Sequence, residues 1–158
     1  MLLLLPLGLV AQELKIAVVN TQELYNVIPE VSTYENEMAK IKADYEQQIK
    51  IMEDEYTRKM SDYTSQADSL TDNIKRLRMQ EIQDLQLRME NFIPMAQEEL
   101  GKKQEELMMP IREKIRKAID SVGEENGYTY IAEAQMFLYK GNNAIDVTEK
   151  VKAKLSAR

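Results

Sequence analysis

The sequence predicts an α+β fold that is mostly α: a long antiparallel helical hairpin, or tentacle, projects from a small β-sheet oligomerisation body formed by both chain ends. Three observations support this prediction. Apolar residues recur with steps of three, four and four through two long segments, and this spacing of about 3.67 residues per turn is typical of an unstrained helix. Short strand-like segments flank the two helices. Together these segments account for most of the 158 residues, so few residues remain for an ordinary globular core.

Residues 1–11 are almost entirely apolar and precede polar Gln12 and Glu13. Their length suits the hydrophobic region of a signal peptide, whereas a membrane-spanning helix needs about 20 residues. We therefore expect a cleaved secretory signal that is truncated at its start, and a soluble exported protein. A retained anchor or a buried N-terminal strand is the alternative.

Residues 12–31 are expected to form the first part of the body. Residues 15–20 form a short segment rich in β-branched side chains, which indicates a strand. Asn20 with Glu23 resembles a capping box that opens a brief helix, and Pro29 should end this helix.

Residues 32–122 are predicted to form the arm, with its tip near residues 68–73. Ser32 with Glu35 should open the first helix, and the second should run to about Val122. Residue i of one helix then faces about residue 141 − i of the other, along an arm of roughly 60 Å. Residues 111–122 extend past the hairpin and should pack on the body. We expect Pro94 and Pro110 to act as hinges, although simple helix curvature is an alternative.

The apolar stripe should form the seam between the helices, because a hairpin must bury one face of each helix. The Tyr and Met residues could instead line a cavity and contact a bound chain. The predicted seam residues are Tyr34, Met38, Ile41, Tyr45, Ile49, Met52, Tyr56, Met60, Tyr63, Ile82, Leu85, Met89, Ile93, Leu100 and Leu107. Apolar residues off this stripe are the better candidates for contact with a bound chain: Leu77, Met79, Leu87, Phe92, Met95, Met108 and Met109.

Residues 123–158 should complete the body. Residues 128–134 and 137–139 are aromatic and strand-like, and Asp146 with Glu149 opens a terminal helix. A body this small buries too little apolar surface to be stable alone, and open sheet edges invite pairing. We therefore expect self-association through Ile16, Val18, Tyr128, Tyr130, Phe137 and Tyr139.

Composition argues against several functions. The chain has no His and no Cys, which removes the commonest general base, metal ligand and thiol nucleophile. Its net charge of −6 disfavours nucleic-acid binding. Pairs such as Glu98 and Glu99 are adjacent on a helix and point to different sides, so they indicate solvated faces rather than an active site. We expect no enzyme activity, no metal and no cofactor.

Three segments then resemble one known family. KIAVVNTQEL at residues 15–24, ENGYTYI at 125–131 and YKGNNAIDVTEKV at 139–151 are similar, in this order around a helical hairpin, to the Skp/OmpH family of periplasmic chaperones. The resemblance implies a homotrimer whose arms hold unfolded outer-membrane β-barrel proteins without ATP, and the sequence has no phosphate-binding P-loop. An exported structural coiled-coil spacer or adaptor is the alternative.

One departure from the family concerns charge. The best-studied relatives are basic, whereas residues 32–123 contain 15 Lys and Arg against 19 Asp and Glu. We therefore do not expect this chain to share the lipopolysaccharide binding of its basic relatives. A compact basic cluster near the tip, Lys75, Arg76 and Arg78, is either solvated or a site for an anion or a membrane surface.

Overall fold

The structure is a computed structural model that describes residues 14–157, so the expected signal peptide lies outside the described residues. The chain divides into two compact units. The base unit holds residues 14–29 and 111–157, and the hairpin unit holds residues 30–110. Each unit is described separately below.

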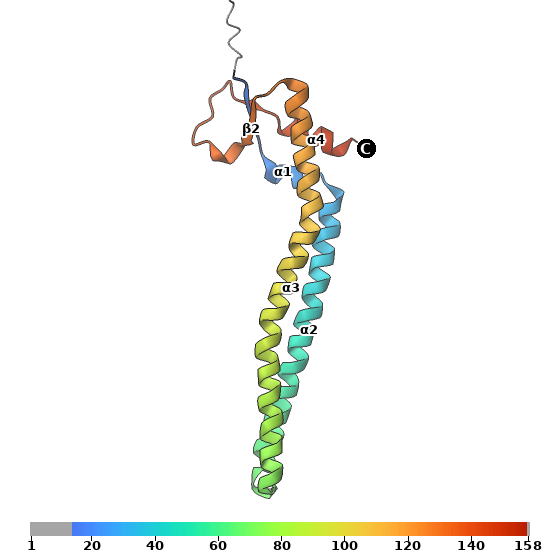
Figure 1. The fold of residues 1–158 in the computed structure, drawn as a ribbon, viewed down its shortest axis with the longest axis vertical. Helices are drawn as coiled ribbons and strands as arrows, with labels where there is room; N and C mark the ends of the chain where they lie inside the picture. Colours follow the sequence, from blue (N-terminus) through green and yellow to red (C-terminus); the bar gives the residue numbers. More distant parts are fainter. Residues whose placement is uncertain (1–13, 158) are drawn as a thin grey trace, which may run out of the picture. The chain divides into compact units, whose positions relative to one another are not determined.

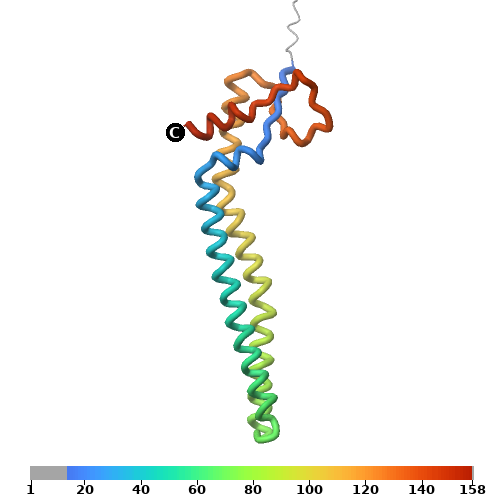
Figure 2. The backbone as a smooth tube through the Cα atoms, turned by 180° about the vertical axis from the view of Figure 1, so that it is seen from behind, coloured from blue at the N-terminus to red at the C-terminus, as the bar shows by residue number. Residues whose placement is uncertain are grey.

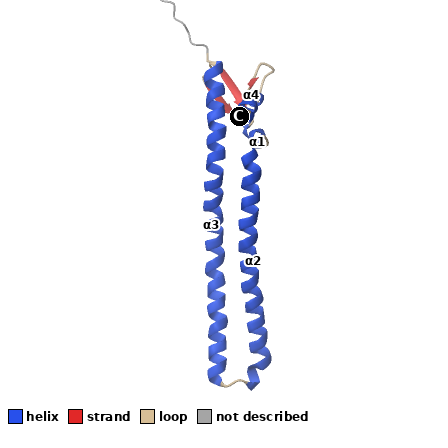
Figure 3. Cartoon of the chain, turned by 90° about the vertical axis from the view of Figure 1, so that its right-hand side faces the viewer, coloured by secondary structure: helices blue, strands red, loops and turns tan. Residues whose placement is uncertain are grey.

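The hairpin unit consists of two long antiparallel helices that run side by side (Figures 1 and 3). Helix α2 spans Pro29–Gln66, and helix α3 spans Asp72–Asn126 and continues into the base unit. The expected start at Ser32 was wrong by three residues. Proline suits the first helical position because its missing N–H would have no partner there and its fixed φ is already helical.

Two ion pairs between the helices define how they are aligned. Lys59 Nζ lies 2.8 Å from Glu81 Oε2, and Lys103 Nζ lies 3.8 Å from Glu37 Oε1. Both pairs match residue i with residue 140 − i, within one residue of the predicted alignment. The chain reverses through a 3₁₀ turn, η1 (Ala67–Ser69), followed by Leu70 and Thr71, which Figure 2 shows at the end of the hairpin.

Helix α3 passes through both Pro94 and Pro110 without interruption. It ends at Asn126, four residues later than predicted. Gly127 adopts a φ of 64°, and the N–H groups of Gly127 and Tyr128 donate to the carbonyls of Glu124 and Gly123. This Schellman arrangement needs a left-handed residue after the helix, which glycine supplies without steric cost.

The base unit contains a parallel sheet of three short strands. Strand β1 (Ile16–Val19) lies between β2 (Tyr130–Glu133) and β3 (Ile145–Asp146), so the prediction of one small sheet from both chain ends is confirmed. Helix α1 (Thr21–Tyr25) follows β1, and helix α4 (Thr148–Ser156) packs on α1 and β1.

The prediction of a strand at residues 137–139 was wrong. These residues follow a 3₁₀ turn, η2 (Ala134–Met136), and belong to an exposed loop that arches away from the sheet (Figure 2). Strand β1 has only two edges, and β2 and β3 occupy both, so no edge of β1 remains for another strand.

A small apolar core holds the base unit together. It combines residues of α1, the last turns of α3, β1 and α4, so segments from both chain ends meet in it. The buried apolar side chains of this unit are Ala17, Val18, Val19, Leu24, Ile28, Ile111, Ile115, Ala118, Val122, Ala134, Val147, Val151 and Leu155.

Candidate binding surfaces

The seam of the hairpin unit is mostly half-buried rather than fully buried. All nine predicted residues of α2, from Tyr34 to Tyr63, are half-buried, as are Met89, Leu100 and Leu107 of α3. Only Ile82 and Leu85 among the predicted seam residues are buried. Two helices form a single layer, so the flanks of each seam residue stay open to solvent.

The structure exchanges the expected places of two neighbours on α3. Phe92 lies in the seam, where its ring meets that of Tyr45 edge-on with centroids 6.0 Å apart. Ile93, expected in the seam, is 36% exposed. Lys103 lies on the inward side and pairs with Glu37. The seam of α3 therefore steps through residues 85, 89, 92, 96, 100, 103 and 107.

Most of the other off-stripe candidates form the exposed apolar surface of the hairpin unit. Leu77, Leu87, Met95 and Met109 are strongly exposed, and Met79 and Met108 are half-buried. Sequence reasoning missed Ile51, which is 49% exposed. Its position two residues after the seam residue Ile49 places it on another face of the helix, and that signal could have identified it.

The residues near the tip and the two prolines lie on the hairpin surface. The guanidinium groups of Arg76 and Arg78 donate hydrogen bonds to the side chains of Asn73 and Gln66. Pro94 and Pro110 are exposed within α3. Their role as hinges stays a prediction.

The base unit also exposes apolar side chains. Of the six residues expected to mediate self-association, Ile16, Tyr130, Phe137 and Tyr139 are exposed, whereas Val18 is buried and Tyr128 is half-buried. Tyr128 is covered by the Lys15 ammonium, 4.5 Å from its ring centre. The sequence reasoning missed four further exposed residues: Leu14, Met136, Leu138 and Ile145.

A groove of about 570 Å³ with both polar and apolar lining opens on the same unit. Strand β1, strand β3 and the loop before β3 line it. The apolar side chains of the groove come from Leu14, Ile16, Phe137, Tyr139 and Ile145, with Lys15 and Lys140 also in its lining.

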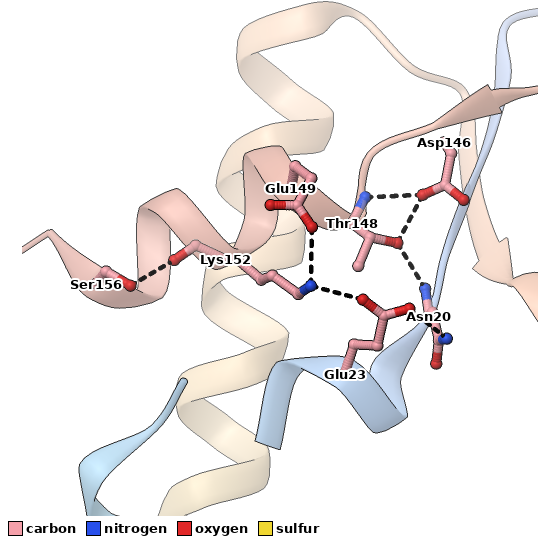
Figure 4. Close-up of polar contacts among 7 residues, drawn as sticks. All are labelled: Asn20, Glu23, Asp146, Thr148, Glu149, Lys152 and Ser156. Atoms are coloured by element: carbon pink, nitrogen blue, oxygen red, sulfur yellow. Dashed lines mark hydrogen bonds and ion pairs between the residues drawn. The ribbon is translucent and has the colours of Figure 1, made fainter. Parts of the chain in front are cut away.

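A polar network joins the start of α4 to β1 (Figure 4). The Thr148 hydroxyl donates to Asp146 Oδ1 at 2.6 Å and accepts from the Asn20 backbone N–H at 2.9 Å. The Thr148 N–H, at the first residue of α4, also donates to Asp146, so this carboxylate provides a partner for one N–H of the first turn. Lys152 pairs with Glu149 and Glu23. Hydrogen bonds to Glu149, which has the larger effect, and to Glu23 raise the pKa of Lys152. The network attaches α4 to both β1 and α1.

The base unit should be less stable in acid, because protonation removes the stabilising charge of Asp146. Hydrogen bonds from the hydroxyl and the N–H of Thr148 hold the pKa of Asp146 below its ordinary value. The stabilisation is thus fully present above the unfolded pKa and is lost as pH falls through the folded pKa. Asp146→Asn keeps a capping side chain but removes the charge. In urea unfolding at a series of pH values, we expect the free energy of unfolding of wild type to exceed that of the variant most at neutral pH. This difference should shrink in acid. Parallel pH profiles would contradict this account.

The described residues bear on two further features, a metal-binding cluster and a membrane-spanning helix. Within residues 14–157, no group of three or more His, Cys, Asp or Glu could hold a metal ion. Over the same residues, no helix is both long and apolar enough to cross a bilayer. Exposed apolar side chains on a thin two-helix layer can instead contact an extended chain along their length.

Comparison with known proteins supports the fold described above. Residues 15–155 match the model of a family described as outer membrane protein, OmpH-like. No curated protein matches the sequence. A solved structure from Caulobacter crescentus CB15, described as an OmpH-like outer membrane chaperone whose role is itself inferred, superposes with a TM-score of 0.76. The match covers 90% of this chain and 83% of that one at 9% identity, so it shows a shared fold.

Proposed function

The chain belongs to the OmpH-like family, and from this premise we propose that it is a holdase chaperone that works without ATP. It binds unfolded outer-membrane β-barrel proteins in the periplasm and prevents their aggregation. It performs no catalysis and needs no cofactor.

The exposed apolar side chains of the hairpin unit support this proposal most directly. Leu77, Leu87, Met95 and Met109 project from α3 outside the seam, where they contribute little to holding the helices together. Methionine and leucine offer adaptable apolar contacts that suit many different sequences. Each contact is weak, but several along one arm act together, and several arms raise the effective concentration further.

The base unit supports self-association. Its three short strands leave open edges, and its exposed aromatic residues Tyr130, Phe137 and Tyr139 are unusual for the surface of a soluble monomer. Further copies of the chain would cover these groups, and three copies would place three arms around one client. Such an assembly explains how weak contacts could retain an unfolded chain.

Aggregation of a urea-unfolded outer-membrane β-barrel, followed by light scattering after dilution, tests the function. We expect the purified protein to suppress scattering at a near-stoichiometric ratio and without nucleotide. The complex should sediment as one species of client and several chaperone copies. A spacer or adaptor protein would leave the scattering unchanged, and that result would refute the holdase function.

A further inference from the structure

Charge is distributed unevenly around the exposed apolar side chains of the hairpin unit. Residues 30–110 contain 18 Asp and Glu against 11 Lys and Arg, so an excess of carboxylates is expected everywhere on this unit. Near the exposed apolar side chains, however, the excess is far larger. Positions three and four residues away on a helix are the spatial neighbours of a side chain, with Cβ atoms about 5–6 Å apart.

Leu87 and Met95 on α3 show the pattern most clearly. Leu87 is 57% exposed, and its neighbours one turn away include the carboxylates Asp84 and Glu90. Met95 is 46% exposed, and its neighbours include Glu98 and Glu99. Neither Leu87 nor Met95 has a Lys or Arg one turn away.

Three other exposed apolar residues of the unit repeat the arrangement, whereas Ile74, which is 40% exposed, has Arg78 and no carboxylate one turn away. Leu77 has Glu81 one turn away, and Ile51 has both Asp54 and Glu55. Met109 has Glu105, Glu106 and Glu113 one turn away, together with one cation, Arg112.

Several lysines of the unit already have carboxylate partners. Lys50 pairs with Asp54, and Lys59 bridges Glu55 and Glu81. Lys102 bridges Glu98 and Glu99. These lysines neutralise part of the carboxylate charge. By contrast, Asp84 has no ion pair among the described residues, and Glu90 accepts a hydrogen bond only from the neutral amide of Gln86.

We propose, building on the holdase function above, that this surface prefers client segments in which apolar residues alternate with lysine or arginine. An apolar side chain of the client would contact Leu87 or Met95, and a cationic side chain one position away would meet the adjacent carboxylates. The long apolar stems of Lys and Arg can lie on the same apolar surface while their charges reach the carboxylates. A segment rich in Asp or Glu would meet like charge at the same places and bind more weakly.

Three labelled peptides with the same length and the same Leu and Phe positions test this preference. Their intervening residues are Lys, Ser or Glu, and fluorescence anisotropy measures their affinity for the purified protein. We expect the Lys peptide to bind about tenfold more tightly than the Glu peptide at low salt, with the Ser peptide between them. The ratio should fall steeply at high salt, because the Debye length shrinks to about 3 Å at 1 M.

Two double variants, which change the net charge by the same amount, test whether the charge preference arises from the carboxylates beside Leu87. Asp84→Asn/Glu90→Gln removes the carboxylates beside Leu87, and Glu35→Gln/Asp44→Asn removes two that have no strongly exposed apolar neighbour one turn away. We expect the first pair to lower the Lys-to-Glu affinity ratio about threefold and the second pair to leave it nearly unchanged, because charge interactions at this exposure act over short distances. Equal affinities for the Lys and Glu peptides, or equal effects of the two variants, would overturn the proposal.

The aggregation assay separates this inference from the function on which it rests. A protein that suppresses aggregation of the unfolded barrel but binds the Lys and Glu peptides equally would retain the holdase function and refute the charge preference. A protein that prefers the Lys peptide but leaves the barrel to aggregate would refute the holdase function instead.

Discussion

Replacing Leu85 by alanine is expected to lower the free energy of unfolding of the hairpin unit by about 2–5 kcal/mol. Leu85 is 1% exposed and is one of the few fully buried side chains in a seam that is otherwise half-buried. The substitution removes apolar contact and leaves a cavity that two rod-like helices can close only by shifting against each other. Urea unfolding followed by circular dichroism at 222 nm measures the loss, because the hairpin contains most of the helix.

Leu87→Ala provides a matched control two residues away. The same atoms are removed, but Leu87 is 57% exposed, so the unfolding free energy should change by about 0.5 kcal/mol or less. If Leu87 contacts clients, its loss should weaken binding of an unfolded barrel about two- to fivefold, since one partly buried side chain contributes on the order of 1 kcal/mol. Equal destabilisation by the two substitutions would contradict the assignment of seam and outer face.

Replacing Thr148 by valine should destabilise the base unit by about 1–3 kcal/mol. Thr148 is 6% exposed, and its hydroxyl both accepts from the Asn20 N–H and donates to Asp146. Valine has nearly the same shape but no hydrogen-bonding group, so the Asn20 N–H loses its partner in a partly buried site. Urea unfolding combined with amide hydrogen exchange of the residues in β1 and α4 would report the loss.

Thr148→Ser keeps the hydroxyl and removes only a methyl group. It should therefore cost about 1 kcal/mol, and the slow exchange of the Asn20 amide should persist. If Thr148→Ser accelerated this exchange as much as Thr148→Val, the methyl group and not the hydrogen bonds would be holding α4 in place.

The long elements were predictable because their signal is local. A stripe repeated over many turns identifies a helix, and a polar break between two stripes identifies the reversal, so the alignment of Lys59 with Glu81 followed within one residue. Strand β3 was not predictable in this way. Ile145 and Asp146 form a two-residue strand because they pair with Ala17 and Val18 of β1. No pattern within two residues can indicate a partner more than a hundred positions away.

The seam on α3 shows the same limit at higher resolution. Phe92 and Ile93 are both apolar neighbours, about 100° apart around the helix, and sequence spacing alone allowed either one to face α2. The ring of Tyr45 on the opposite helix decides in favour of Phe92. Exposure of Leu87 and Met109 could be predicted, because no spacing of three or four residues connects them to the seam, whereas Met95 lies three residues after the seam residue Phe92. Their binding roles remain predictions.

The parallel sheet has a consequence for when this protein can mature. Strand β1 is among the first described segments to leave the ribosome, yet both of its neighbours, β2 and β3, come near the end of the chain. A truncated product that stops before residue 145 could still pair its two long helices, which are adjacent in sequence, but β1 would lack β3 as a neighbour. Since closing a loop costs more entropy as the loop lengthens, a zipped hairpin that brings residues 37 and 103 together also shortens the search that remains. The complete three-stranded sheet can therefore form only after the chain has been made through Asp146.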